Sequence, residues 1–215
     1  MDPAVSQWDL PRLHLVTDAR PGRDALHIVA AALSVAAPGE LAVQVRVEDE
    51  VTDRQAYAFA LAVLGLCRPR QVLCLVNDRL HVALAVDADG GHVGAADLPV
   101  AAARKVLGAA GVLGATCRDA PAARAAVAAG ASYLGVGPAY LSTTKDGLPE
   151  PLGPAGVGAV ALAEPGTPVI AIGGITVDRV APVRNAGAHG VAVVGTLANA
   201  ADPARVAAEL FKAVA

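Results

Sequence analysis

The sequence predicts an α/β domain folded as a (β/α)₈ barrel, one domain over residues 1–215 with an irregular segment at 1–11. Short runs of Val, Ile and Leu alternate with longer Ala-rich stretches, and eight such pairs can be counted. Polar residues or glycines follow these runs, where a barrel builds its active site. No linker or charge run divides the chain. A doubly wound open sheet is the alternative topology.

The expected strands are aliphatic runs that stop at a polar residue or a glycine. They lie at Leu13–Thr17, Leu41–Val47, Val72–Val76, Gly91–Val93, Val112–Thr116, Tyr133–Val136, Val169–Ile172 and Val191–Val194. In the second strand, alternation puts Gln44, Arg46 and Glu48 on one face and valines on the other. The valine face needs a covering helix, and an inward arginine needs an anionic partner.

The expected helices are the stretches between these runs. They lie near Asp24–Val35, Asp53–Leu66, Leu80–Val86, Val100–Leu107, Ala122–Ala129, Ala155–Ala163, Val177–Ala186 and Ala204–Val214. Capping residues or first-turn prolines mark five starts, at Thr52 or Asp53, Asp97 with Pro99, Asp119 with Pro121, Thr176, and Asp202 with Pro203. Three helices are followed by glycine, at Gly108, Gly130 and Gly187.

Composition limits the classes of partner. Hydrophobic residues make up 54% of the chain and aromatic residues 3%, so the core is aliphatic and a base-stacking surface is poorly supplied. A net charge of −3 gives no electrostatic case for nucleic acid or a membrane surface as partner. Three cysteines without metal-ligand spacing predict reduced thiols in a cytoplasmic protein. No signal peptide or spanning run is recognisable, and a homo-oligomer is left open.

The loop from Gly137 to Gly147 has the composition of an anion-binding loop. It places the hydroxyls of Ser142, Thr143 and Thr144 beside the positive charge of Lys145. An ordinary surface loop capped by hydroxyls is the alternative. Glycine turns after the last two strands, at Gly173 with Gly174 and at Gly195, suit a phosphate held on backbone amides, although tight turns alone can also require glycine.

Two aspartates at successive strand ends predict a magnesium site. Asp78 and Asp97 supply the one or two carboxylates through which Mg²⁺ binds, with waters and substrate phosphate oxygens completing its shell. Each can instead be read as the N-cap of the following helix. Asn77 ends its apolar strand and suits a ligand contact. The five histidines, His14, His27, His81, His92 and His189, are expected to be scattered structural or surface residues.

The chain resembles the thiamine phosphate synthase family. The resemblance runs from LHLVTD at Leu13 to the last helix and is strongest in LVNDR, ADGGHVGAADLP, GVGPAYLSTTK, VIAIGGI and AGAHGVAVVGTL. It implies a barrel enzyme that joins a hydroxymethylpyrimidine diphosphate to a thiazole phosphate and releases pyrophosphate. By resemblance, the pyrimidine diphosphate is held by Gln44, Arg46, Asn77, Thr116 and Lys145. Mg²⁺ is held by Asp78 and Asp97, and the thiazole phosphate by Ser142, Thr143, Thr144, Gly174 and the backbone of Val194 and Gly195.

The implied catalysis is electrostatic. Mg²⁺, Arg46 and Lys145 stabilise the departing pyrophosphate, with Thr116 beside them, and the thiazole nitrogen captures the resulting pyrimidine-methyl cation. The chain departs from the family where Glu48 replaces a lysine, Thr116 a serine and Gly195 a serine.

Two other functions remain open from the sequence. A thiazole tautomerase is favoured by Glu48, but position 118, where such paralogues have a histidine, is Arg118. The second is a non-catalytic protein that binds thiamine phosphate or thiazole phosphate.

Overall fold

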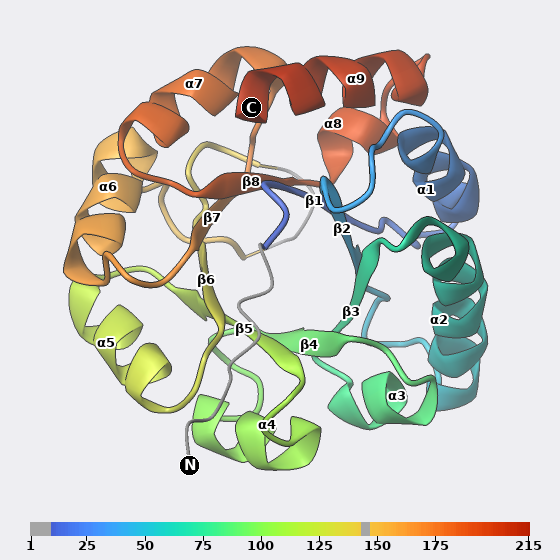
Figure 1. Cartoon of the computed structure of the whole chain (residues 1–215), viewed down its shortest axis with the longest axis horizontal. Helices are drawn as coiled ribbons and strands as arrows, with labels where there is room; N and C mark the ends of the chain where they lie inside the picture. Colours follow the sequence, from blue (N-terminus) through green and yellow to red (C-terminus); the bar gives the residue numbers. More distant parts are fainter. Residues whose placement is uncertain (1–9, 143–146) are drawn as a thin grey trace.

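Eight parallel strands pair in sequence order, and the last returns to the first to close a barrel (Figure 1). The structure is a computed structural model that describes residues 10–142 and 147–215. Leu13 of the first strand pairs with Leu41 of the second and with Val191 of the eighth. The predicted (β/α)₈ barrel is therefore confirmed, and the open doubly wound sheet is wrong because the sheet has no free edge.

The strands are four to six residues long, and each starts and ends within two residues of its predicted bounds. They are β1 (Leu13–Val16), β2 (Leu41–Val45), β3 (Leu73–Asn77), β4 (Gly90–Val93), β5 (Val112–Cys117), β6 (Tyr133–Val136), β7 (Val169–Ile172) and β8 (Gly190–Val193). The helices are α1 (Ala25–Leu33), α2 (Asp53–Cys67), α3 (Leu80–Ala85), α4 (Val100–Leu107), α5 (Ala120–Ala128), α6 (Gly153–Ala163), α7 (Val177–Asn185), α8 (Gly195–Ala198) and α9 (Pro203–Val214). A 3₁₀ turn at Arg68–Arg70 and the short α8 were not expected.

Strand β2 ends two residues before the expected Val47, and a side chain explains the difference. The hydroxyl of Thr17 accepts from the Arg46 N–H at 2.8 Å and donates to the Arg46 carbonyl at 2.8 Å. The threonine thus replaces a backbone partner for the residue after the strand. Arg46 is consequently held in place although it lies outside the sheet.

Helix caps follow the sequence in most places. Thr52 forms a capping box with Gln55, and Asp119 and Asp202 accept first-turn N–H groups as predicted. Asp97 does not cap α4, whose N-cap is Pro99. Neither aspartate proposed for the metal therefore caps a helix, because α3 begins after Arg79 without a side-chain cap.

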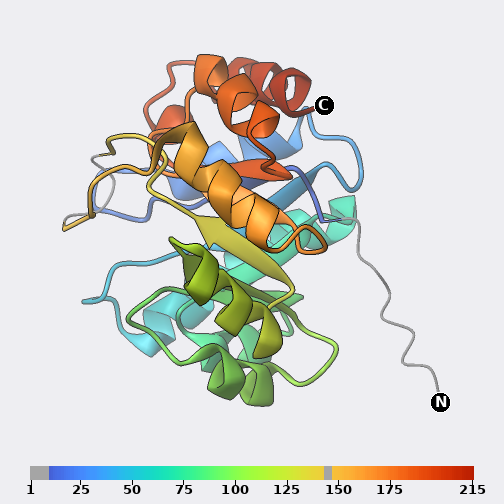
Figure 2. The same cartoon turned by 90° about the vertical axis from the view of Figure 1, so that its left-hand side faces the viewer.

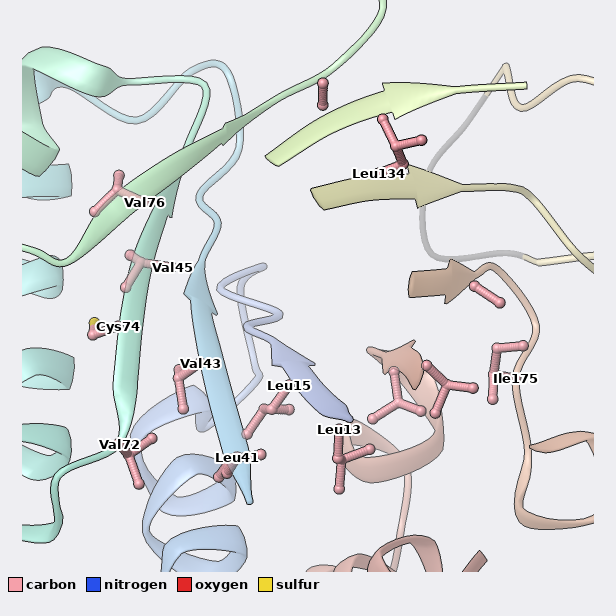
Figure 3. Packing of buried hydrophobic residues seen from close by; sticks show 14 of the residues in the cluster. Leu13, Leu15, Leu41, Val43, Val45, Val72, Cys74, Val76, Leu134 and Ile175 are labelled. Carbon is pink, nitrogen blue, oxygen red and sulfur yellow. The ribbon is translucent and has the colours of Figure 1, made fainter. Parts of the chain in front are cut away.

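Period-two alternation divides the buried residues into two cores. Outward side chains such as Leu15, Leu41 and Val43 pack between the strands and the helices (Figure 3). Inward side chains, among them Val16, Leu75, Val112, Tyr133 and Ile170, fill the barrel. The predicted valine face of β2 therefore does meet covering helices, as expected from its alternation.

Loops at the carboxyl ends of the strands form one end of the barrel. Figure 2 shows the described parts of the loop between β6 and α6, in yellow, at one side of the molecule. Among residues 10–142 and 147–215, no helix combines the length and apolarity needed to cross a membrane.

Candidate functional site

Three predicted ligand residues come from the inward-facing positions of neighbouring strands. Gln44 lies inside β2, Asn77 ends β3, and Thr116 stands one residue before the end of β5. Asn77 pairs in register with His92, whose ring contacts the Thr116 hydroxyl. Gln44 and Thr116 thus belong to one buried hydrogen-bond network inside the barrel, and Asn77 lies beside it.

Arg46 already has an anionic partner within the chain. Its guanidinium lies 3.3 Å and 3.5 Å from the two carboxylate oxygens of Glu48, and the two side chains are only 17% and 29% exposed. The predicted shared face of Arg46 and Glu48 is therefore correct. The glutamate sits against the arginine, so an anion that uses Arg46 has to compete with it.

The β2–α2 loop that carries Glu48 is held from the next strand. Arg79, directly after the β3 end, binds the Asp53 carboxylate at 2.7 Å and the carbonyls of Glu48 and Asp49 at 3.4 Å and 3.3 Å. The loop is consequently tied to the neighbouring β3–α3 turn.

The β3 end and the turn after β4 carry side-chain oxygens of the type that suits magnesium. The side-chain oxygen of Asn77 is buried and has no hydrogen-bond partner. Asp78 adopts a left-handed backbone with φ of 64°, a conformation that costs free energy in a residue with a side chain. Asp97 folds back so that its carboxylate accepts the Gly94 N–H at 2.7 Å.

This oxygen set fits Mg²⁺ better than a metal that needs many protein ligands. No group of three or more His, Cys, Asp or Glu side chains that could hold a metal is found in the described part of the chain. Mg²⁺ usually keeps several waters and uses one or two carboxylates with substrate oxygens. An orphaned amide oxygen beside Asp78 is consistent with a ligand that the protein alone does not provide.

The β7 end forms a glycine turn that packs on the β6–α6 loop. Gly173 and Gly174 have φ of 94° and 62°, and a side chain on Gly173 would meet Pro138 at 2.6 Å. Ala139 and Tyr140 donate their N–H groups to the carbonyls of Ile172 and Gly173 at 2.7 Å and 3.0 Å. The start of this loop is thereby paired with the end of β7.

Further contacts fix the turns after β7 and β8. Arg179 donates to the Gly174 carbonyl at 2.8 Å, and its guanidinium lies 4.8 Å from the Tyr140 ring centre. Thr196, in α8, donates its hydroxyl to the Ile175 carbonyl. Val194 and Gly195 form the junction between β8 and α8, where the sequence predicts a phosphate contact.

The predicted anion loop is described only at its two ends. Ser142 is half-buried, while Thr143, Thr144 and Lys145 lie outside the described residues. Arg118 binds both sides of the loop, donating to the Gly137 carbonyl at 3.0 Å and to the Glu150 carbonyl at 2.7 Å. Arg118 is therefore hydrogen-bonded to the backbone of this loop.

Two of the five histidines, His14 and His92, are buried structural residues as predicted, but they are not scattered, because one network joins them. Contacts of 2.9–3.1 Å link side chains from five strands, in the order His14, Gln44, Tyr133, His92 and Thr116. Burial lowers the pKa of His14 to about 3 and that of His92 to about 4, so both rings are neutral at pH 7. Burial likewise raises the pKa of Tyr133.

A sequence signal for this network exists. Alternation along apolar strands points three polar side chains into the barrel, those of His14, His92 and Tyr133. A polar side chain at such a position requires a buried hydrogen-bond partner. Glycines on adjacent strands make room for the rings, because a side chain at Gly114 would collide with His92 and Tyr133, and one at Gly135 would lie 2.7 Å from His92.

Asp18, which follows the β1 end, forms ion pairs with two arginines of the same loop. Its carboxylate receives two hydrogen bonds of 2.7 Å from Arg20 and lies 3.5 Å from Arg23. The hydrogen bonds from Arg20 hold its pKa below the usual range. A cavity of about 180 Å³ beside it is lined by Thr17, His27 and Val194, among others.

Comparisons with known proteins show the family to which this chain is similar. Residues 13–197 match the family described as TMP-TENI, thiamine monophosphate synthase. A thiamine-phosphate synthase of Salinispora arenicola is 63% identical over 95% of this chain and 98% of its own, and one of Salinispora tropica is 62% identical over the same shares. A solved structure of a Pyrococcus furiosus thiamine phosphate pyrophosphorylase is 31% identical, with a TM-score of 0.85 and 97% of each chain covered.

Proposed function

The chain belongs to the TMP-TENI thiamine monophosphate synthase family, and from this membership we propose its reaction. It is a thiamine-phosphate synthase, a transferase that condenses 4-amino-2-methyl-5-hydroxymethylpyrimidine diphosphate with thiazole phosphate. The products are thiamine phosphate and pyrophosphate. The observation that carries this function is the 63% identity to a thiamine-phosphate synthase over 95% of the chain.

The pyrimidine diphosphate is assigned to the β2, β3 and β5 ends. Gln44 uses its amide N–H groups on His14 and Tyr133, so only its carbonyl oxygen is left to accept from the pyrimidine amino group. The diphosphate is assigned to Arg46, the Thr116 hydroxyl and Lys145. These cations and donors stabilise negative charge as the bond to the leaving group breaks.

We assign Asp78 and Asp97 as the residues that hold Mg²⁺, with the Asn77 side-chain oxygen beside them. When bound, the metal neutralises charge on the diphosphate. The chain's own part is to fix two carboxylates at adjacent strand ends, one through the left-handed backbone of Asp78 and one through the Gly94 N–H.

The thiazole phosphate is assigned to the other half of the barrel mouth. Ser142, Thr143 and Thr144 contribute hydroxyls, while Gly174 and the Val194–Gly195 backbone contribute the glycine turns. Pairing of Ala139 and Tyr140 with the β7 end supports this assignment, because it brings the start of the β6–α6 loop against the Gly173–Gly174 turn. The thiazole nitrogen then bonds to the pyrimidine methylene carbon. The two substrates react because the site holds them close together, and no protein nucleophile takes part.

The tautomerase alternative lacks support from position 118. Arg118 donates to two loop carbonyls, and an arginine side chain has no acceptor atom, so it cannot replace a histidine in taking up a proton. We expect a cytoplasmic enzyme with small-molecule substrates, and its three buried cysteines are free thiols.

Incubation of the purified protein with both substrates and Mg²⁺ tests the proposal. Thiamine phosphate and pyrophosphate should appear in equal amounts, and omission of either substrate should abolish both. Isomerised thiazole phosphate without any thiamine phosphate would instead establish the tautomerase, and binding without turnover would establish the sensor.

A further inference from the structure

The buried network runs from the floor of the barrel to the site, and the direction of each of its hydrogen bonds can be deduced. At the floor, His14 Nε2 lies 3.0 Å from the Pro11 carbonyl oxygen, which can only accept. His14 Nε2 therefore carries the proton. Because the buried ring is neutral, its Nδ1 must accept, and the Gln44 amide nitrogen at 2.9 Å donates to it.

The second Gln44 N–H determines the orientation of the tyrosine. The Gln44 nitrogen lies 3.1 Å from the Tyr133 oxygen, so that oxygen accepts. The Tyr133 hydroxyl hydrogen then points to His92 Nδ1, 3.0 Å away. His92 in turn keeps its proton on Nε2 and donates to the Thr116 oxygen at 2.9 Å.

The opposite orientation of the upper half is costly. If His92 donated from Nδ1, the Tyr133 oxygen would receive two donors and its own hydrogen would be left without the His92 acceptor. Tyr133 is fully buried, and an unsatisfied buried donor costs about 1–3 kcal/mol. The orientation in which every donor has an acceptor is therefore the stable one.

We propose that His92 is a positioning residue that makes the Thr116 hydroxyl a hydrogen-bond donor to the diphosphate end of the substrate. This inference rests on the proposed function for the identity of the anion. The Thr116 oxygen is occupied by the His92 N–H, so its hydrogen turns toward the barrel mouth. A chain of donors aligned in one direction also strengthens its terminal donor. The threonine thus presents a proton, and not a lone pair, to an anion.

Wild-type protein provides the first test, because no variant has to fold. Long-range ¹H–¹⁵N spectra at pH 7 distinguish the two neutral imidazole tautomers. His14 and His92 should both carry their proton on Nε2. A His92 ring protonated on Nδ1 would overturn the proposal whatever the catalytic activity.

Binding of inorganic pyrophosphate in the presence of Mg²⁺ provides the second test. The variants are Thr116→Val and His92→Phe, the second of which keeps a ring beside Gly114 and Gly135. Calorimetry should show that each variant binds pyrophosphate about tenfold more weakly than the wild type. The double variant should bind within about twofold of either single variant, because both changes remove the same hydrogen bond. Losses that multiply would show that His92 acts independently of Thr116 and would overturn the proposal.

Three further variants separate this role from general loosening of the core. Thr116→Ser should retain the affinity, since it keeps the hydroxyl. Tyr133→Phe should lower it, because His92 loses the donor that fixes its tautomer, and unchanged affinity would contradict the inference. Val112→Ala trims the same interior without touching the network and should bind pyrophosphate as the wild type does.

The outcomes distinguish failure of this inference from failure of the proposed function. Expected tautomers and coupled pyrophosphate binding without synthase turnover would refute the reaction but not the role of His92. Normal turnover with uncoupled binding losses would refute the role of His92 and leave the reaction intact.

Discussion

At the scale of single residues, two charged groups at the strand ends, Arg46 and Asp18, form ion pairs within the chain. Arg46 contacts Glu48, and Asp18 is bound by Arg20. The first of these pairs gives the acid at position 48 a cationic neighbour. Glu48 reduces the charge available from Arg46 but also fixes where its guanidinium lies.

Glu48→Gln should strengthen binding of the pyrimidine diphosphate. Arg46 would no longer have to leave an ion partner, and a partly exposed pair of this kind contributes up to about 1 kcal/mol, or about fivefold in affinity. The measurement is KM for the diphosphate at low and high salt, where screening should shrink the gain. Asp49→Asn, one residue further along the loop, is the control; a weaker Glu48→Gln enzyme would show that Glu48 has a positive role.

Asp78→Asn should raise the Mg²⁺ concentration needed for half-maximal activity by at least about tenfold. Asparagine tolerates the left-handed backbone at this position, so the change removes charge without adding strain. Asp87→Asn is a matched control, because Asp87 is also left-handed and exposed but follows α3 at the opposite end of the barrel. Equal magnesium dependence in both variants would refute the assignment of Asp78.

At the scale of elements, alternation and capping signals were enough to place the strands and most helices. They failed at the end of β2, where the Thr17 side chain replaces a backbone partner of Arg46. They also failed for α8, because a four-residue helix is too short to show a helical repeat of apolar residues. Alternation predicted the face on which Gln44 lies, and the pattern of strand ends predicted that Thr116 lies at the end of its strand. The network through His92 and Tyr133 was missed, because it depends on five strands being closed into one barrel.

Arg118→Met should loosen the β6–α6 loop while leaving the barrel folded. The two hydrogen bonds from Arg118 join loop carbonyls thirteen residues apart, at Gly137 and Glu150. We expect kcat/KM for thiazole phosphate to fall about tenfold, since charge-assisted bonds of this kind contribute about 1.5–3 kcal/mol. Faster proteolysis in the loop should accompany it. Arg124→Met on the exposed face of α5 should change neither, and an unaltered Arg118→Met loop would contradict the anchoring role.

At the scale of the whole molecule, the barrel encloses neutral imidazoles that would be charged in an unfolded chain at mildly acidic pH. The pKa of His14 is about 3 in the folded protein, against about 6.5 for an unfolded histidine. Between these values the unfolded state binds the extra proton. Stability from this group is therefore complete above about pH 6.5 and falls as the pH decreases toward 3.

Urea unfolding at pH 7, 6 and 5 should reveal this loss. His14 contributes a slope of about 1.4 kcal/mol per pH unit in the acidic part of that range. His14→Gln, which does not titrate, should remove that slope even if it lowers overall stability, whereas His27→Gln on the surface of α1 should retain it. The same slope in His14→Gln and wild type would show that His14 is charged when folded.

Gly114 and Gly135 set a limit on how this enzyme can diversify. One added methyl group at either position would be forced against His92 or Tyr133. Substitutions should therefore be tolerated least at Gly114 and Gly135, although neither residue has a side chain that could contact a substrate. Directed evolution of a new substrate range would gain most from libraries that vary the loops and leave these two glycines unaltered.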